Sequence, residues 1–141
     1  MNLANPASHP RTRLVLPLTL LVFGCVGIAA AWSLMALYGT NQRGWMAVVA
    51  AVDAAWMLRL GGMRAGGWRA LLAVVGTLAC IALANWGIAA LQMGLPMGLD
   101  AWDALVKPGL GYVWTLSGLA NTAMDKLWAL VALIVAAWLG R

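Results

Sequence analysis

Residues 71–91 read LLAVVGTLACIALANWGIAAL, a stretch without a single charged side chain. About 20 apolar residues in a helix cross the hydrocarbon core of a bilayer. Three further runs are similarly apolar, at residues 14–38, 45–60 and 122–139. Backbone groups in lipid must form their hydrogen bonds within the segment, which favours helices. The sequence therefore predicts an all-α polytopic membrane protein, a single domain (1–141) built as a bundle of four transmembrane helices.

The composition excludes the other broad classes. Of the 141 residues, 64% are hydrophobic and 9% are charged, whereas a soluble domain is about 45–50% apolar and about 25% charged. A disordered chain would be poor in apolar residues and rich in charge. Nine basic and four acidic residues are too few to cover a soluble fold of this size.

Basic residues predict the orientation in the membrane. Six basic residues lie near the chain ends and the 61–68 loop: Arg11, Arg13, Arg59, Arg64, Arg69 and Arg141. Three lie near the opposite ends of the apolar runs: Arg43, Lys107 and Lys126. By the positive-inside rule, both termini and the 61–68 loop lie in the cytoplasm. Alanine-rich usage and the preference for arginine over lysine favour a bacterial inner membrane. The excess of basic residues therefore indicates the orientation in the membrane and contact with the headgroups of the lipid bilayer. We expect no nucleic-acid partner.

The first apolar run has a second interpretation. Arg11 and Arg13, followed by an apolar segment that reaches Cys25, resemble a lipoprotein signal. The apolar region of a signal peptide spans about 7–15 residues. Here the run continues to Leu37. We therefore expect this run to form a transmembrane helix.

The second and fourth runs show a weak internal similarity. Residues 46–59 align with 128–141, with half of the positions identical, and Trp32 aligns with Trp86 in a fainter match of the first and third runs. A duplication of two helices would produce this pattern. The shared alanine, leucine and tryptophan content of apolar helices would also produce it.

The long connection 92–121 predicts a periplasmic interfacial segment. Residues 98–107 form an amphipathic pattern in which Asp103 and Lys107 can pair four positions apart. Such a helix lies along a membrane surface, where it either covers an outward-facing site or serves as a simple connection. The residues expected at this interface are Asp100, Trp102, Asp103, Lys107, Tyr112 and Trp114.

Asp53 lies in the middle of an apolar run, whereas Asp125 lies near the start of one. An ionised carboxylate at that depth costs several kcal/mol, at least about 2.5, unless it has a partner, contacts water or is protonated. Counting residues from the ends of the runs brings Thr77, Cys25 and Cys80 to similar depths, with Asn85 nearer the outer side. Two interpretations remain, a site for a proton or cation and a hydrogen-bonded contact between helices.

The sequence contains no recognisable catalytic motif. It has one histidine, in the N-terminal tail, and its two cysteines lie inside apolar runs, so we expect no enzyme activity, cofactor or metal. The leading hypothesis is a structural or accessory membrane protein that acts through helix–helix contacts, as a homo-oligomer or within a larger complex. The alternative is a small oligomeric transporter or channel in which Asp53 responds to protons or cations.

Overall fold

The computed structural model describes residues 12–39, 44–107, 109, 111, 115, 118 and 123–141. This part of the chain is all-α, as predicted. Its helices are α1 (Thr12–Tyr38), α2 (Met46–Leu60), α3 (Gly67–Gly94), α4 (Ala101–Val106) and α6 (Ala123–Gly140).

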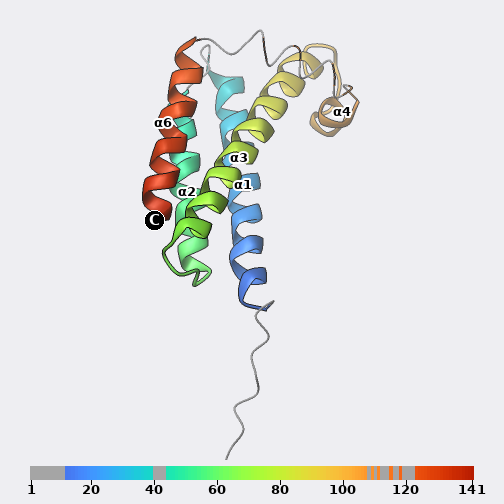
Figure 1. The fold of residues 1–141 in the computed structure, drawn as a ribbon. Coiled ribbons are helices and arrows are strands. Elements are labelled where there is room, and N and C mark those ends of the chain that lie inside the picture. Colours follow the sequence, from blue (N-terminus) through green and yellow to red (C-terminus); the bar gives the residue numbers. More distant parts are fainter. Residues whose placement is uncertain are drawn as a thin grey trace, which may run out of the picture.

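Four helices run side by side, with α1 and α3 in one direction and α2 and α6 in the other (Figure 1). Helix α3 packs closely on every other described helix, whereas no Cα atom of α1 comes within 8 Å of one in α6. The short α4 packs against α3 alone. We refer below to the end of the bundle where α4 lies as the α4 end, and to the end with the turn between α2 and α3 as the loop end.

Three helices are long and apolar enough to cross a membrane: α1, α3 and α6. Helix α3 has 28 residues, more than the predicted run 71–91, and is about 42 Å long. It therefore extends beyond a hydrocarbon core of about 30 Å unless it tilts. Helix α2 has 15 residues, about 22 Å, and is not among the three candidate spans. The structure thus supports a membrane protein with about three spans, fewer than the four predicted.

Small residues allow α1 and α3 to approach closely. The Ser33 hydroxyl on α1 donates to Ala29 O at 2.8 Å and lies 3.5 Å from Ala84 O on α3. A Cβ added at Gly87 would overlap this hydroxyl. In lipid, helices associate through such close packing because the hydrophobic effect does not drive them together.

Helix α2 is lined with alanine on its buried sides. Ala47, Ala51 and Ala55, spaced four apart, are at most 5% exposed, and Ala50 and Ala54 are equally buried. These two stripes let α2 contact α1, α3 and α6 at once. Alanine at these positions explains how a short helix fits among three longer ones.

Arg69 ties the loop end together. Its guanidinium donates to Gly140 O at 3.1 Å and Leu139 O at 3.4 Å on α6, and to Met63 O at 3.3 Å in the turn after α2. The last carbonyls of a helix lack partners within the helix and carry a partial negative charge, which a cation stabilises. At the same end of the bundle, Gly140 on α6 lies close to Ala70 on α3, and Gly61 after α2 lies close to Pro17 on α1.

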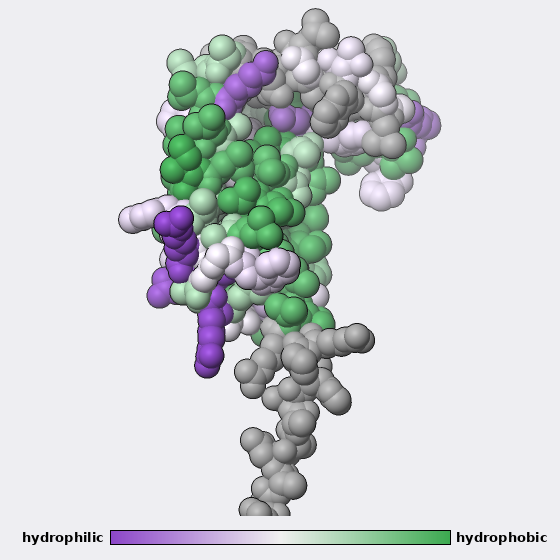
Figure 2. Space-filling model, viewed as in Figure 1, coloured by the Kyte–Doolittle hydropathy of each residue, from purple (hydrophilic) through white to green (hydrophobic). Residues whose placement is uncertain are grey.

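Large apolar side chains cover the outside of the bundle. Phe23 on α1 is 78% exposed and Trp138 on α6 is 75% exposed. Figure 2 shows an apolar band on the bundle, with hydrophilic residues gathered near its two ends. This distribution is suited to contact with a lipid bilayer.

The connection after α3 differs in part from the prediction. Gln92, Met93 and Gly94 belong to α3, and α4 covers Ala101–Val106, a shorter helix than the predicted 98–107. Asp103 and Lys107 form the expected ion pair at 2.6 Å, exposed to solvent, and Asp100 and Trp102 are also exposed. The predicted interfacial residues Tyr112 and Trp114 lie outside the described residues.

Two contacts attach α4 to the bundle. Ala104 packs against Gly94, where there is no room for a Cβ, and Trp86 Nε1 donates to Leu105 O at 3.3 Å. Helix α4 packs on α3 and on no other described helix, and Figure 1 shows it beside the bundle. Helix α4 itself therefore lies to the side of the bundle and not over its end.

The packing bears on the weak similarity between the two halves of the chain, for which duplication was one of two explanations. Helices α1 and α3 are parallel neighbours, as are α2 and α6, and Ser33 faces Gly87 close to the Trp32–Trp86 alignment. However, α2 packs closely on α3, while the backbones of the equivalent pair, α1 and α6, have no Cα atoms within 8 Å of each other. The helix pairs are thus arranged in a similar way without an exact two-fold relation.

Candidate functional site

Asp53 lies at the centre of α2 and is half-buried. Its carboxylate rests on the backbone of α1, where a Cβ added at Gly24 would lie 2.5 Å from Oδ2 and 2.9 Å from Met57 Cγ. Within the described part of the chain, the side chain has no hydrogen-bond or ion-pair partner. Glycine at position 24 is therefore what creates space for a carboxylate between α1 and α2.

Cys25 and Cys80 face each other across the α1–α3 interface. Both are free thiols, 6% and 1% exposed. Cys25 Sγ donates to Gly76 O on α3 at 3.3 Å, and Cys80 Sγ lies 3.6 Å from Cys25 O on α1. Depth counting predicted similar levels for the two residues, and the structure shows that they are also neighbours.

Thr77 is fully buried and turns back to its own helix. Its hydroxyl donates to Ala73 O at 2.7 Å. No hydrogen bond in the described part of the structure joins Asp53 to Thr77, Cys25 or Cys80. Gly24 and Cys25 are consecutive on a helix and point about 100° apart, so Asp53 contacts one side of α1 and the thiols occupy another.

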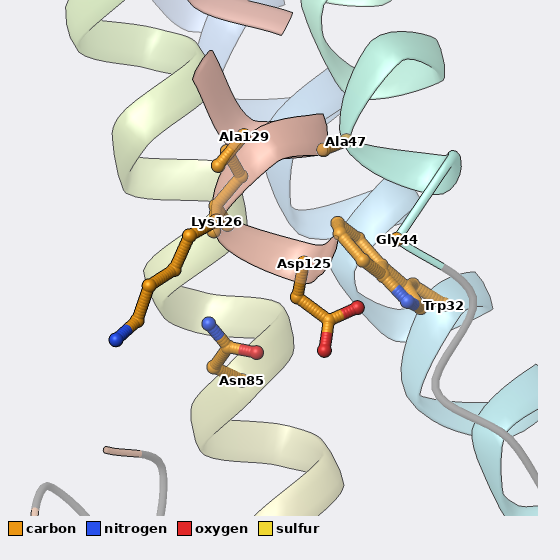
Figure 3. A pocket seen from close by; sticks show the side chains of 8 residues that line it. Trp32, Gly44, Ala47, Asn85, Asp125, Lys126 and Ala129 are labelled. Carbon is orange, nitrogen blue, oxygen red and sulfur yellow. The ribbon is translucent and has the colours of Figure 1, made fainter. Parts of the chain in front are cut away.

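A pocket lies between the four long helices at the α4 end (Figure 3). Its cavity volume is about 70 Å³, and each helix or the turn beside it contributes to its lining. The lining residues are Trp32, Gly44, Ala47, Ile81, Asn85, Asp125, Lys126 and Ala129. Asn85 was predicted as an intramembrane polar candidate, and here it is one of the few polar residues that line a largely apolar pocket.

The indole of Trp32 forms part of the wall of this pocket. Trp32 is 4% exposed, and its Nε1 is buried without a hydrogen-bond partner among the described residues. A buried donor without a partner costs about 1–3 kcal/mol.

Two charged residues accompany Trp32 and Asn85. In Figure 3 the Asp125 carboxylate points into the space near Asn85 and Trp32, while the Lys126 ammonium extends away from it. Sequence reasoning did not select Trp32, Asp125 or Lys126, because tryptophan and charged residues near the end of a span are usual at a membrane interface. The pocket provides donors and acceptors for water or a small ion, and Asp53 is not among its lining residues.

The described residues offer no evident metal centre. Among them, no group of three or more histidine, cysteine, aspartate or glutamate side chains could hold a metal ion. The polar chemistry of this part of the chain therefore lies in three places: the Asp53 carboxylate, the thiol pair and the Trp32 pocket.

No protein-family model, no curated protein and no solved structure matches the chain.

The contact between Gly24 and Asp53 is testable with a matched pair of variants. We expect Gly24→Ala to lower the free energy of unfolding by about 1–3 kcal/mol, because the new methyl group overpacks against Asp53 and Met57. Gly27→Ala, on the same helix with open space around it, should be neutral or slightly stabilising. Thermal and denaturant unfolding in detergent would measure both.

The double variant Gly24→Ala/Asp53→Ala should recover part of the loss, because the carboxylate no longer occupies the space. Equal effects of Gly24→Ala and Gly27→Ala would contradict this packing.

Proposed function

We propose that the protein is a structural or accessory component of a bacterial inner membrane that acts through helix–helix contacts, with a second copy or within a larger complex. The observation that carries the proposal is the half-buried Asp53, which has no partner among the described residues and lies at the centre of a helix packed along candidate membrane spans. A carboxylate in lipid is costly and favours a protein partner, water or protonation.

The surface next to Asp53 supports such contacts. Gly27, one turn along α1 from Gly24, is exposed and has open space where a side chain would stand. Exposed glycine lets another helix approach closely. Phe23 on α1 and Trp56 on α2 are exposed at 78% and 63% and offer large apolar surfaces nearby in the sequence. A helix of another chain seated here would remove Asp53 from lipid.

As part of this proposal, α2 also crosses the membrane, so that α1, α2, α3 and α6 make four spans. Helix α2 runs antiparallel to α1 and α3 and packs along both. Its length of about 22 Å is less than a hydrocarbon core of about 30 Å, which local thinning of the bilayer can accommodate. Trp45 before α2 and Arg59 in its last turn are suited to the two headgroup regions.

The proposed orientation places the loop end in the cytoplasm. Arg59 and Arg64 are exposed there, and Arg141 lies at the end of α6 near Arg69. Helix α4 and the ion pair of Asp103 with Lys107 then lie on the periplasmic side. Arg11 and Arg43, which also enter the positive-inside argument, lie outside the described residues.

The second candidate is a small oligomeric transporter or channel in which Asp53 responds to protons or cations. Two observations favour it: the carboxylate without a partner among the described residues, and the pocket at the α4 end, whose lining includes Asn85 and Asp125. A pocket of about 70 Å³ suits water or a small ion and excludes a larger solute.

The four-span topology predicts opposite accessibility for two positions. In a background with Cys25→Ser and Cys80→Ser, we expect Leu105→Cys to react with a membrane-impermeant maleimide on spheroplasts, and Met63→Cys to react after lysis alone. The reason is that the positive-inside rule assigns the turn at Met63 to the cytoplasm. Labelling of Met63→Cys before lysis would contradict the proposed orientation.

Assembly through the surface next to Asp53, formed by Phe23, Gly27 and Trp56, predicts a particle larger than one chain. Native mass measurement after purification in mild detergent should give a multiple of 14.9 kDa or a stable complex with another membrane protein. Gly27→Leu should shift the mass toward the single chain, because a bulky side chain blocks close helix approach. Ala82→Leu, on the exposed surface of α3, is the matched control. A strictly monomeric wild-type protein without a partner would contradict the proposal.

Asp53→Asn separates the two candidate functions. If Asp53 carries a transport function, the variant should keep its fold and unfolding temperature and lose ion or proton flux in proteoliposomes. Asp103→Asn, in the exposed ion pair of the α4 region, should leave the flux unchanged. Absence of flux in the wild-type protein, together with an altered assembly of Asp53→Asn, would favour the structural role instead.

A further inference from the structure

The cysteine pair has features that packing alone does not require. Each thiol is directed at the backbone of the opposite helix: Cys25 Sγ at Gly76 O on α3, and Cys80 Sγ at Cys25 O on α1. The two side chains are also close enough to interact directly. Both cysteines are thus at one contact point between two helices that are far apart in sequence.

The helices are held in this register by a second, similar contact. Ser33 on α1 lies 3.5 Å from Ala84 O on α3, at the same sequence separation of 51 residues as Cys25 and Gly76. Gly76 faces Leu21 and Gly87 faces Ser33, with no room for a Cβ at either glycine. A disulfide requires Cα atoms within about 4.4–6.8 Å, and closely packed backbones favour such a separation.

The position of the pair also restricts what can reach it. Cys25 lies 13 residues into α1 and Cys80 lies 13 residues into α3, so both are about 20 Å along parallel helices. Both thiols are nearly inaccessible and lie inside candidate membrane spans. A water-soluble thiol oxidant would first have to enter the apolar region, whereas a lipid-soluble oxidant is already in that region and has only to pass between the helices that cover the thiols.

We propose that Cys25 and Cys80 form a redox site that a lipid-soluble quinone oxidises to an intramolecular disulfide. The two S–H bonds break and one S–S bond forms between α1 and α3. The two electrons and two protons pass to the quinone oxygens and give the quinol. The product is a covalent link between the two helices, and thiol reduction reverses it.

The disulfide can be detected on the full-length protein in its own membranes. The membranes are reduced, treated with decylubiquinone, quenched with acid, denatured and reacted with a polyethylene-glycol maleimide. We expect two tags on the reduced protein, none after oxidation, and two again after dithiothreitol. The intact oxidised chain should be lighter by two hydrogen atoms.

Variants define the pairing. Cys25→Ser and Cys80→Ser should each keep one tag under all conditions and remain monomeric on non-reducing gels. Cys80→Ser/Ala84→Cys retains two cysteines but moves one of them by a helical turn, about 6 Å, and should keep both tags. Retention of both tags on the quinone-treated wild-type protein would overturn the proposal, as would loss of tags in the displaced pair or a disulfide-linked dimer of a single-cysteine variant.

Discussion

The close approach of α1 and α3 is the constraint on which the rest of the bundle depends. These parallel helices meet through serine, cysteine, alanine and glycine, and a methyl group at Gly87 would collide with Ser33. In lipid, close packing replaces the hydrophobic effect as the source of helix association, so one added Cβ in the contact weakens that association. Helix α3 can then serve as the central element, with α2 and α6 packed against it and α1 beside it.

The small-residue interior has a consequence for the surface. Apart from Trp32, Leu21, Leu58 and a few others, the buried residues of the described bundle are alanine, glycine, cysteine, serine and threonine. The large aliphatic and aromatic side chains are on the outside, where they contact lipid or another protein. This distribution is the reverse of a soluble core, in which large apolar residues are inside. The buried hydroxyl and thiol groups therefore lie close to helix backbones and bond to backbone carbonyl oxygens.

The sequence predicted the helices well and their contacts poorly. Apolar runs locate α1, α2, α3 and α6, because hydropathy marks the residues that lie in lipid. Hydropathy cannot mark where a helix ends beyond the lipid, so α3 is longer than its run 71–91 and α4 is shorter than predicted. The positive-inside argument and the interfacial residues Tyr112 and Trp114 stay predictions.

The candidate sites show the same limit. Counting 1.5 Å per residue placed Cys25 and Cys80 at similar depths. Depth does not give the rotation of each helix about its axis. That rotation brings the two cysteines together and leaves Thr77 bonded to its own helix. The Trp32 pocket was missed because it is formed by four helices, and its polar residues separately resemble ordinary interfacial residues.

The Asp53 carboxylate and the thiol pair are joined by two consecutive residues of α1. Gly24 contacts Asp53 on α2, and Cys25 contacts Gly76 and Cys80 on α3. Asp53 Oδ2 lies where a side chain at residue 24 would stand, so glycine at this position lets the carboxylate rest on the backbone of α1. The next residue places its thiol in the α1–α3 contact, so one turn of α1 carries both polar features.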